Sequence, residues 1–568
     1  MKEKFVTGWK FLKTDFGTEL EDVRNRLSEF KKVEIPHDFL IDDARNFYTD
    51  ATGWYYKGFV TTLKPRHFLV FDGIYMDSTV YINGKKAGEW KYGYSQFILD
   101  ITDYCKVGSN DVLVRVNYQN PNSRWYSGAG IYRNVWLCSY EDTYIPENGI
   151  YVHTHKGDMG YFLDIDTEIK GEISKNTSVS YRLFDDKKRE VSLNATGKSF
   201  FARNVKEWSN DEPNLYTLEV TLFDGNNELQ REEVLIGFRS ISFDPDKGFL
   251  LNGKVTKLNG VCIHHDLGAL GAAYNNSAMK RRLIQLKGMG VNAIRLTHNM
   301  FDPQTIELLD RMGFMAISEG FDMWERSKTE FDYARFFPEW HERDVESWVK
   351  RDRNHPSVIM WSIGNEIYDT HADERGAQIT RMLKELVEKF DYMGNAHPTF
   401  GSNYMPWENA QKCADILKVV GYNYAEKFYE KHHREHPDWV IYGSETYSIV
   451  QSRGIYHFPL SEGILADDDL QCSSLGNSQT SWGAESIESC ICMDRDMPFS
   501  MGQFIWTGYD YIGEPTPYHT KNSYFGLIDT AGFYKDAYYA WKSAWVSAGK
   551  DPFVHVFPYW DFNEGEFL

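Results

Sequence analysis

The chain lacks the features that mark several large classes of protein. Basic residues are in the minority, 62 against 82 acidic ones, and no segment gathers Lys and Arg densely enough to neutralise a phosphate backbone. No uninterrupted apolar run approaches the length of a membrane span. We therefore expect neither nucleic acid nor a membrane as a partner.

Cysteine is also scarce, with seven residues in 568 and no repeated Cys-x-x-Cys spacing. An odd number of cysteines cannot complete a disulfide framework, which favours a reducing compartment. The start MKEKFVTGWKFLK has no apolar core of the kind found in signal peptides. We expect a cytoplasmic protein. A secreted or periplasmic location stays open, because removal of a signal peptide would leave the same trace.

The first part of the chain has the pattern of two successive β domains, predicted at residues 1–142 and 143–242. Short segments of alternating polarity, such as 78–90 and 111–120, are separated by Gly, Asn and Asp turns. The Asn-Gly pair at 83–84 is a strong hairpin signal. No convincing helical periodicity interrupts either domain.

From about residue 250 the pattern changes to alternating strands and helices. Helical periodicity is clearest at 278–290, 302–313 and 378–390. The candidate strands are 256–266, 291–299, 314–320, 357–366, 398–403, 416–424, 439–445 and 502–510. Eight strands in about 300 residues predict a (β/α)8 barrel over 243–550. The tail, 551–568, is interpreted as the possible start of a further β domain.

Two of these strands end in a glutamate. Glu366 follows the apolar run SVIMW, and Glu445 follows DWVIY. A carboxylate at the end of a buried strand is costly unless the fold uses it. Because active sites of (β/α)8 barrels lie at the carboxyl ends of the strands, both side chains should project into one mouth.

A facing pair of carboxyl groups is what cleavage of a glycosidic bond requires. One group donates a proton to the leaving oxygen, and the other attacks the anomeric carbon. We expect Arg295 and Tyr424 to keep the attacking carboxylate ionised. Asn365, beside the proposed acid, is placed to hydrogen-bond the hydroxyl next to the anomeric carbon.

Five motifs in order along the chain give a family resemblance. They are NGVCIHHDLGALGAA, NAIRLTHN, WSIGNE, YGSET and FIWTGYDYIGEPTPY. Together they resemble glycoside hydrolase family 2, most closely its bacterial β-galactosidase-like branch. The segments IPHDF (35–39) and SRWYSGAGIYRNVWL (123–137) are similar to the family's jelly-roll sugar-binding domain. The resemblance implies that this jelly roll is followed by an immunoglobulin-like β-sandwich and then the catalytic barrel.

The resemblance also implies roles for single residues. By motif match, Glu366 would be the acid/base and Glu445 the nucleophile. The positions at which the family contacts the sugar of the first subsite correspond to His264, His298, Asn365, Tyr424 and Trp506. The alternative for the two histidines is a structural place in the core, and for Trp506 it is packing at the barrel mouth.

Two departures from the family pattern bear on cofactor and substrate. Some members hold magnesium with a histidine after strand three, but SEGFDMWER (318–326) contains none, so we expect no essential metal and no cofactor. The β-glucuronidase branch carries an Asn-x-Lys clamp where this chain has Ser523, Tyr524 and Phe525, although Lys521 and Asn522 are close by. A neutral hexose is favoured.

The sequence therefore predicts a retaining exo-glycosidase that removes terminal β-D-galactosyl residues from an oligosaccharide or glycoside. The alternatives are a related activity on a β-glucuronide, β-galacturonide or α-arabinopyranoside, or a carbohydrate-binding protein without catalysis. The presence of both glutamates argues against the last of these. Assembly into a homo-oligomer stays open.

Overall fold

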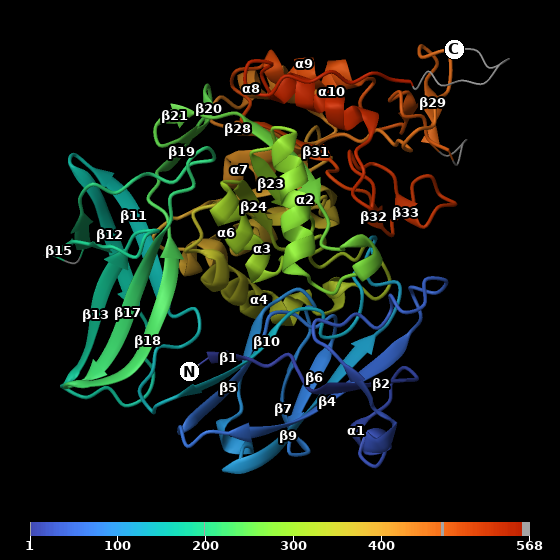
Figure 1. The fold of residues 1–568 in the computed structure, drawn as a ribbon. Helices are drawn as coiled ribbons and strands as arrows, with labels where there is room; N and C mark the ends of the chain where they lie inside the picture. Colours follow the sequence, from blue (N-terminus) through green and yellow to red (C-terminus); the bar gives the residue numbers. More distant parts are fainter. Residues whose placement is uncertain (1, 198, 467–470, 559–568) are drawn as a thin grey trace.

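The computed structural model describes residues 2–197, 199–466 and 471–558. Three bodies are visible in Figure 1: a β-sandwich at the N-terminus, a second sandwich beside it, and a barrel that contacts both. The predicted class, two β domains followed by a (β/α)8 barrel, is confirmed.

The N-terminal sandwich has one sheet of four strands and one of six. The smaller sheet runs in the order β1 (Lys2–Lys4), β10 (Val135–Tyr140), β5 (Arg66–Phe71), β8 (Phe97–Asp100). The larger sheet runs β3 (Lys31–Val33), β2 (Trp9–Thr14), β4 (Ala51–Thr61), β9 (Gly108–Tyr118), β6 (Ser78–Ile82), β7 (Lys85–Trp90). Asn83 and Gly84, with φ of 50° and 75°, form the predicted hairpin turn between β6 and β7.

The second sandwich packs two four-stranded sheets and has its own apolar core. One sheet runs β11 (Ile150–Gly157), β12 (Gly160–Thr167), β16 (Ser199–Ala202), β15 (Leu193–Thr196). The other runs β14 (Glu190–Val191), β13 (Thr177–Phe184), β17 (Tyr216–Asp224), β18 (Asn227–Ile236). Leu163, Leu183 and Leu218 are fully buried between the sheets. This core is separate from the one that the barrel shares with the N-terminal sandwich.

The barrel is closed by eight parallel strands, in agreement with the prediction. They are β22 (Leu258–Ile263), β23 (Ala293–Leu296), β24 (Met315–Glu319), β25 (Val358–Asn365), β26 (His397–Ser402), β27 (Val419–Asn423), β28 (Val440–Tyr447) and β31 (Gly502–Trp506). Around them lie helices that include α2 (Asn276–Gly288), α3 (Pro303–Met312), α4 (Phe337–Asp352), α6 (Glu374–Phe390) and α7 (Glu408–Leu417).

Burial explains why these segments read as continuous apolar runs. Every residue of β25 and of β28 is buried, since each strand faces packed side chains inside the barrel and helices outside it. The polar residues that end these strands therefore come out together at the mouth of the barrel.

The N-terminal sandwich is fixed to the barrel by buried polar contacts. Arg133 Nη2 donates to the Met300 carbonyl at 2.6 Å, and Tyr92 Oη donates to the Gly320 carbonyl at 2.6 Å. Gly320 directly follows β24, so the contact lies at the carboxyl end of the barrel. The sandwich thus sits where it can contribute side chains to the mouth.

Two further predictions concern the tail and the membrane. Residues 551–558 form no strand, and 559–568 lie outside the described residues, so the prediction of a further β domain at 551–568 is untested. A search of the described residues finds no helix with the length and apolarity needed to cross a membrane.

Candidate active site

Glu366 and Glu445 face the same cleft at the mouth of the barrel. Glu366 directly follows β25 with a left-handed φ of 45°, and its N–H donates to the Gly401 carbonyl at 2.8 Å. Glu445 lies within β28 and is 3% exposed. The cleft has a volume of about 530 Å³. Its other lining residues are Arg124, His298, Asn403, Asn423, Tyr424, Trp482, Trp506, Glu514, Thr516 and Phe525.

Glu445 is held by strong donors. Arg295 Nη1 donates to its Oε1 at 2.8 Å, and Tyr424 Oη donates to its Oε2 at 2.7 Å. Burial raises the pKa of Glu445 to about 8 and the neighbouring Glu366 adds to the rise, while Arg295 and Tyr424 oppose it. Both expected partners of this carboxylate are in place.

Glu366 has a weaker set of contacts. Asn423 Nδ2 donates to its Oε1 at 3.0 Å, and the side chain is partly exposed to the cleft. Glu445 thus accepts from a charged donor, Arg295, whereas Glu366 accepts from a neutral amide. A charged donor favours the ionised form of the carboxyl group that accepts from it. The predicted roles, Glu445 as nucleophile and Glu366 as acid/base, stay predictions, and the donors to the two carboxyl groups differ in the sense that these roles require.

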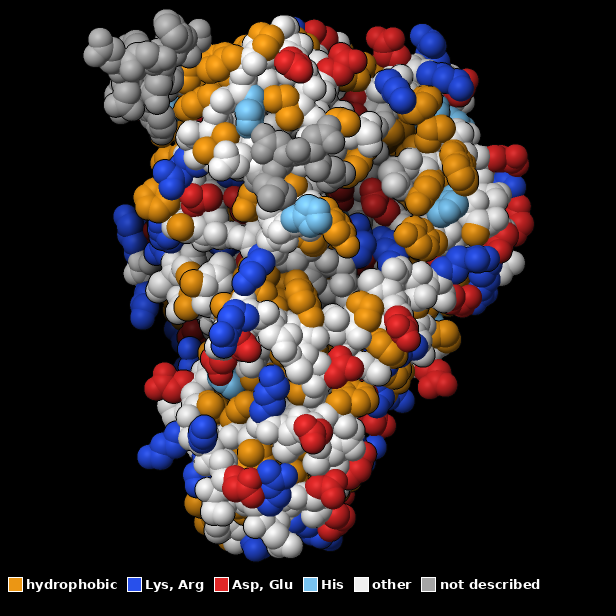
Figure 2. All heavy atoms as spheres, turned by 90° about the vertical axis from the view of Figure 1, so that its right-hand side faces the viewer, with side chains coloured by type: hydrophobic (Ala, Val, Ile, Leu, Met, Phe, Trp, Pro, Cys, Tyr) orange, Lys and Arg blue, Asp and Glu red, His pale blue; other side chains and the backbone are white. Residues whose placement is uncertain are grey.

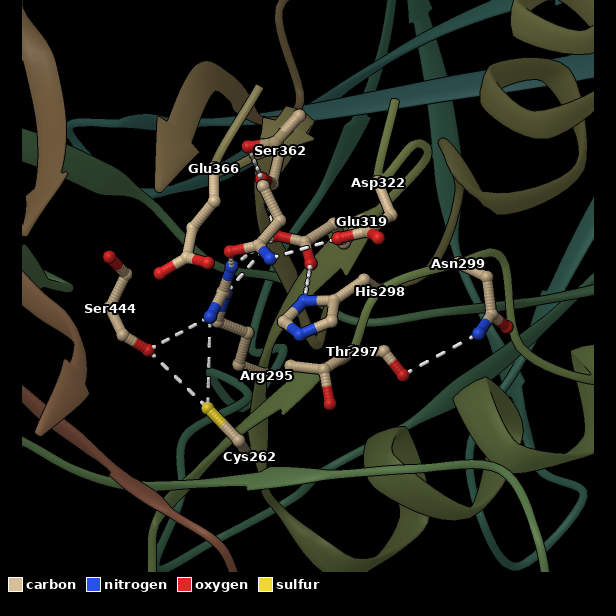
Figure 3. Close-up of polar contacts among 12 residues, drawn as sticks. Cys262, Arg295, Thr297, His298, Asn299, Glu319, Asp322, Ser362, Glu366 and Ser444 are labelled. Carbon is tan, nitrogen blue, oxygen red and sulfur yellow. Dashed lines mark hydrogen bonds and ion pairs between the residues drawn. The ribbon is translucent and has the colours of Figure 1, made fainter. Parts of the chain in front are cut away.

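Arg295 is the centre of a buried network behind the pair. Its side chain is 0% exposed and donates to Glu319 Oε2 from Nη2 at 2.7 Å and from Nε at 3.1 Å. Figure 3 shows Arg295 and His298 converging on Glu319, and Arg295 Nη1 also donates to the Ser444 carbonyl at 3.1 Å. Burial raises the pKa of Glu319 and Arg295 opposes it. One cation thus balances two buried carboxyl groups.

Asn365 belongs to this network rather than to the cleft wall. Its side chain is fully buried and its Oδ1 accepts from Arg295 Nη2 at 2.9 Å and from Asn423 Nδ2 at 3.1 Å. Its Nδ2 donates to Asp322 Oδ1 at 3.0 Å. The predicted sugar contact by Asn365 stays a prediction, and in this structure its contacts orient neighbouring residues.

His298 and Trp506 form one wall of the cleft. Their rings are stacked, with centroids 5.1 Å apart. Burial, with Arg295 nearby, lowers the pKa of His298, so the neutral ring donates from Nδ1 to Glu319 at 2.7 Å. Its Nε2, 3.6 Å from Glu445 Oε1, is then an acceptor that a sugar hydroxyl can use.

His264 is adjacent but recessed. Its ring lies 5.0 Å from that of Trp125 and 5.3 Å from that of Trp506, and it is not among the residues that line the cleft. Neither ring nitrogen has a hydrogen-bond partner among the described residues. The sugar contact predicted for His264 remains a prediction.

Sequence reasoning missed a contribution from the N-terminal sandwich. Arg124 reaches the cleft, donating to Asp322 Oδ1 from Nη2 at 2.8 Å and to Glu514 Oε1 from Nη1 at 3.0 Å. Arg124 lies 198 positions before Asp322, and no local sequence pattern indicates that the two residues will meet. Glu319 was missed for a different reason: it ends a buried strand as Glu366 does, and the same signal could have identified it.

The expectation of no essential metal can be tested directly. In the described part of the chain, His153, His155 and Asp164 form a group of three side chains close enough together to hold an ion, on β11 and β12 of the second sandwich and outside the cleft. Because SEGFDMWER (318–326) contains no histidine, we expect EDTA to leave kcat nearly unchanged. A loss of about tenfold or more, restored by magnesium, would show that a metal acts in catalysis.

The Arg295 network should be essential for stability. Arg295→Met leaves Glu319 and Glu445 buried without their cation, a change that typically costs about 3–5 kcal/mol. We expect a clearly lower unfolding temperature of the barrel in calorimetry. Arg311→Met, which removes a half-exposed ion pair with Glu307 on α3, is the control and should change stability by less than about 1 kcal/mol. Equal effects of the two variants would contradict this assignment.

The coupling of the two glutamates predicts a shift in the pH profile. Glu445 must be ionised to attack, so kcat/KM rises as the pH approaches its pKa of about 8. Glu366→Gln removes the neighbouring carboxylate that raises this pKa. With a dinitrophenyl glycoside, the acidic limb of the variant should therefore lie at lower pH than that of the wild type. An unchanged or higher midpoint would contradict the coupling.

Comparison with known proteins agrees with this geometry. Family models of glycosyl hydrolases family 2 match the sugar-binding domain at 26–140, the central domain at 143–239 and the TIM barrel domain at 245–431. The β-galactosidase BoGH2A of Bacteroides ovatus is 36% identical to this chain, and the match covers the whole of this chain and 74% of BoGH2A. A Putative beta-glucuronidase of Formosa agariphila is 29% identical over 99% of this chain, which spans 57% of that protein.

A solved structure shows the same architecture. A beta-glycosidase from Bacteroides vulgatus superposes with a TM-score of 0.85 at 30% identity, over 96% of this chain and 75% of that one. The matches cover both sandwiches and the barrel that carries the paired glutamates. The chain is a glycoside hydrolase and belongs to family 2.

Proposed function

We propose that the enzyme is a retaining exo-glycosidase that hydrolyses terminal β-D-galactosyl residues. Glu445 is the nucleophile and Glu366 the acid/base, and Tyr424, His298 and Trp506 contact the sugar in the first subsite. This goes beyond membership of the family, whose relatives carry different substrate names.

The charge of the cleft carries the proposal of a neutral sugar. Its wall includes three carboxyl groups, those of Glu366, Glu445 and Glu514, and the one cation among its lining residues is Arg124. That guanidinium is already paired with Asp322 and Glu514. Among the described residues that line the cleft, a uronate would meet acidic groups and no unpaired cation, which costs binding energy. A neutral hexose meets no such penalty.

The position of Lys521 supports the same reading. It is the lysine closest in sequence to the place of the uronate clamp, but its Nζ donates to the Ala44 carbonyl of the N-terminal sandwich at 2.6 Å. Lys521 does not line the cleft. Galactose is then favoured over other neutral sugars by the Bacteroides ovatus relative, whose name is that of a β-galactosidase.

The reaction proceeds by double displacement. Glu445 attacks the anomeric carbon while Glu366 protonates the leaving oxygen, which gives a glycosyl ester on Glu445 and the free aglycone. Glu366 then takes a proton from water, and the resulting attack releases the sugar with its original configuration. Arg295 and Tyr424 stabilise the carboxylate that departs in the second step.

A panel of nitrophenyl glycosides tests the sugar. The β-galactoside should have the highest kcat/KM, and the β-glucuronide and β-galacturonide the lowest, because a uronate would meet the carboxyl groups of the cleft wall. A β-glucuronide turned over faster than the β-galactoside would overturn the assignment. Absence of turnover with every member would favour a binding protein instead.

A further inference from the structure

A second depression opens beside the catalytic cleft, with a volume of about 640 Å³. It is formed at the carboxyl ends of β25 and β26. Tyr368 and His371, from α5 (Tyr368–Ala372), and Tyr404, from the turn between β26 and α7, line it. Trp407, from the same turn, does not line the depression but contacts the rings of His371 and Tyr404. We call these four residues the aromatic platform. The mechanism described above does not use them.

The platform is an ordered cluster of rings that is open to solvent. His371 is stacked on Tyr404 with centroids 3.7 Å apart, and Trp407 meets His371 edge-on at 5.2 Å. Trp407 is 54% exposed and Tyr368 is 40% exposed. An exposed aromatic cluster on a soluble domain commonly marks a binding surface.

The turn that carries the platform is anchored to the barrel. Met405, which lies between Tyr404 and Trp407 in the sequence, is fully buried. The Tyr404 N–H donates to Ser402 Oγ at 3.0 Å, and the Trp407 N–H donates to the Tyr404 carbonyl at 2.9 Å. The rings are therefore held in place before any ligand arrives, which lowers the entropic cost of binding.

The platform lies on the side of the cleft that belongs to Glu366. Tyr368 follows Glu366 by two residues, and Asn403, which lines the cleft, directly precedes Tyr404, which lines the depression. Burial raises the pKa of Tyr404, and the charge of Glu366 adds to the rise. Figure 2 shows recessed acidic side chains in a hollow, with hydrophobic side chains and a histidine on the surface beside it.

This placement has a chemical consequence. The acid/base protonates the leaving oxygen, so the leaving group must extend past Glu366 and away from Glu445. Glu325 and Arg326 line the depression with Tyr368, His371 and Tyr404, which gives it polar groups beside aromatic faces. Such a combination suits a sugar ring, which has apolar faces and hydroxyls at its edge.

We propose that the aromatic platform binds a sugar residue of the leaving group, so that the natural substrate is an oligosaccharide rather than a glycoside with a small aglycone. The inference rests on the proposed roles of Glu366 and Glu445. It concerns the leaving group of the substrate, whereas the names of the relatives refer only to the sugar that is cleaved off.

Trp407→Ala tests the platform with two substrates that share the galactosyl group. For lactose, whose leaving group is a sugar, kcat/KM should fall about 5- to 30-fold. For β-galactosyl fluoride, which has no aglycone to bind, kcat/KM should change less than about twofold. Tyr392→Ala is a matched control, because Tyr392 is also 54% exposed but follows α6 at the opposite end of the barrel. It should affect neither substrate.

Equal losses for lactose and the fluoride, or no loss with either, would overturn the inference. A second measurement does not depend on the identity of the cleaved sugar. Cellotetraose should bind to the inactive Glu445→Gln protein, and binding by calorimetry should weaken at least fivefold when Trp407→Ala is added. If wild type cleaves no galactoside but this binding depends on Trp407, the platform stands and the galactose assignment fails. If Trp407→Ala does not change the affinity for cellotetraose, the proposed role of the aromatic platform is refuted, whichever sugar is cleaved.

Discussion

Glu445→Gln should lose on the order of 10⁴-fold or more of its activity, whatever the leaving group. The carboxamide cannot form the glycosyl ester on which both steps depend, and a better leaving group does not replace the missing nucleophile. Steady-state kinetics with a dinitrophenyl galactoside and with lactose would give the two losses. They should be equally severe.

The fold should tolerate this substitution. The Gln carbonyl oxygen can still accept from Arg295, and its NH2 group can donate to the Tyr424 hydroxyl oxygen. The substitution also removes one of two carboxyl groups that share a buried cation. Unfolding temperature should therefore be close to that of wild type. Glu408→Gln, an exposed position on α7, is the control and should keep full activity. If Glu445→Gln retained more than a hundredth of wild-type activity with the dinitrophenyl substrate, Glu445 would not be the nucleophile.

Glu366→Gln should instead lose more activity with substrates whose leaving group needs protonation than with substrates whose leaving group does not. A dinitrophenolate leaves without protonation, so formation of the glycosyl enzyme should survive, whereas cleavage of lactose should fall by about 10²- to 10⁴-fold. Pre-steady-state kinetics should show a burst of dinitrophenol followed by slow turnover, because no base activates water in the second step.

Azide should rescue the Glu366→Gln enzyme. It attacks the glycosyl enzyme without a general base, so the product should be a β-galactosyl azide. In a Glu445→Ala enzyme, azide can only attack the substrate directly and would give the α-azide. Finding the two configurations exchanged by NMR would mean that the acid and the nucleophile have been assigned in reverse.

The barrel was predictable from sequence because its strands have two clear signals. Residues such as those of β25 and β28 are buried on both faces and form continuous apolar runs, and each run ends in residues that are polar and functional. The amphipathic helices between them have the expected period, as in α3 and α6. These two signals are enough to place Glu366 and Glu445 at the same mouth.

The parts of the site that depend on packing were not predictable. Arg124 enters the cleft because the N-terminal sandwich docks on the carboxyl end of the barrel, an arrangement that Arg133 and Tyr92 secure through contacts far apart in sequence. Whether His264 faces the sugar or lies behind Trp506 depends on ring positions that a linear pattern does not contain. The aromatic platform likewise requires α5 and the turn before α7 to meet.

The buried network gives the two carboxyl groups different surroundings. Arg295 contacts Glu319, Glu445 and Asn365, so one rigid group fixes the proposed nucleophile and the residue before the proposed acid/base. Glu366 has no charged donor among its hydrogen-bond partners in the described part of the chain. We expect different donors at the two carboxyl groups, rather than different residue types, to separate the roles proposed for them.

The most direct test of the mechanism is to trap the glycosyl enzyme with 2-deoxy-2-fluoro-galactosyl fluoride and to locate the label by mass spectrometry of the digested protein. A 2-fluoro substituent slows both steps, and the fluoride leaving group allows the first to proceed, so the ester accumulates. The account predicts one added 2-fluorogalactosyl group on the peptide that contains Glu445. A label on the peptide that contains Glu366, or inactivation without any covalent sugar, would contradict it.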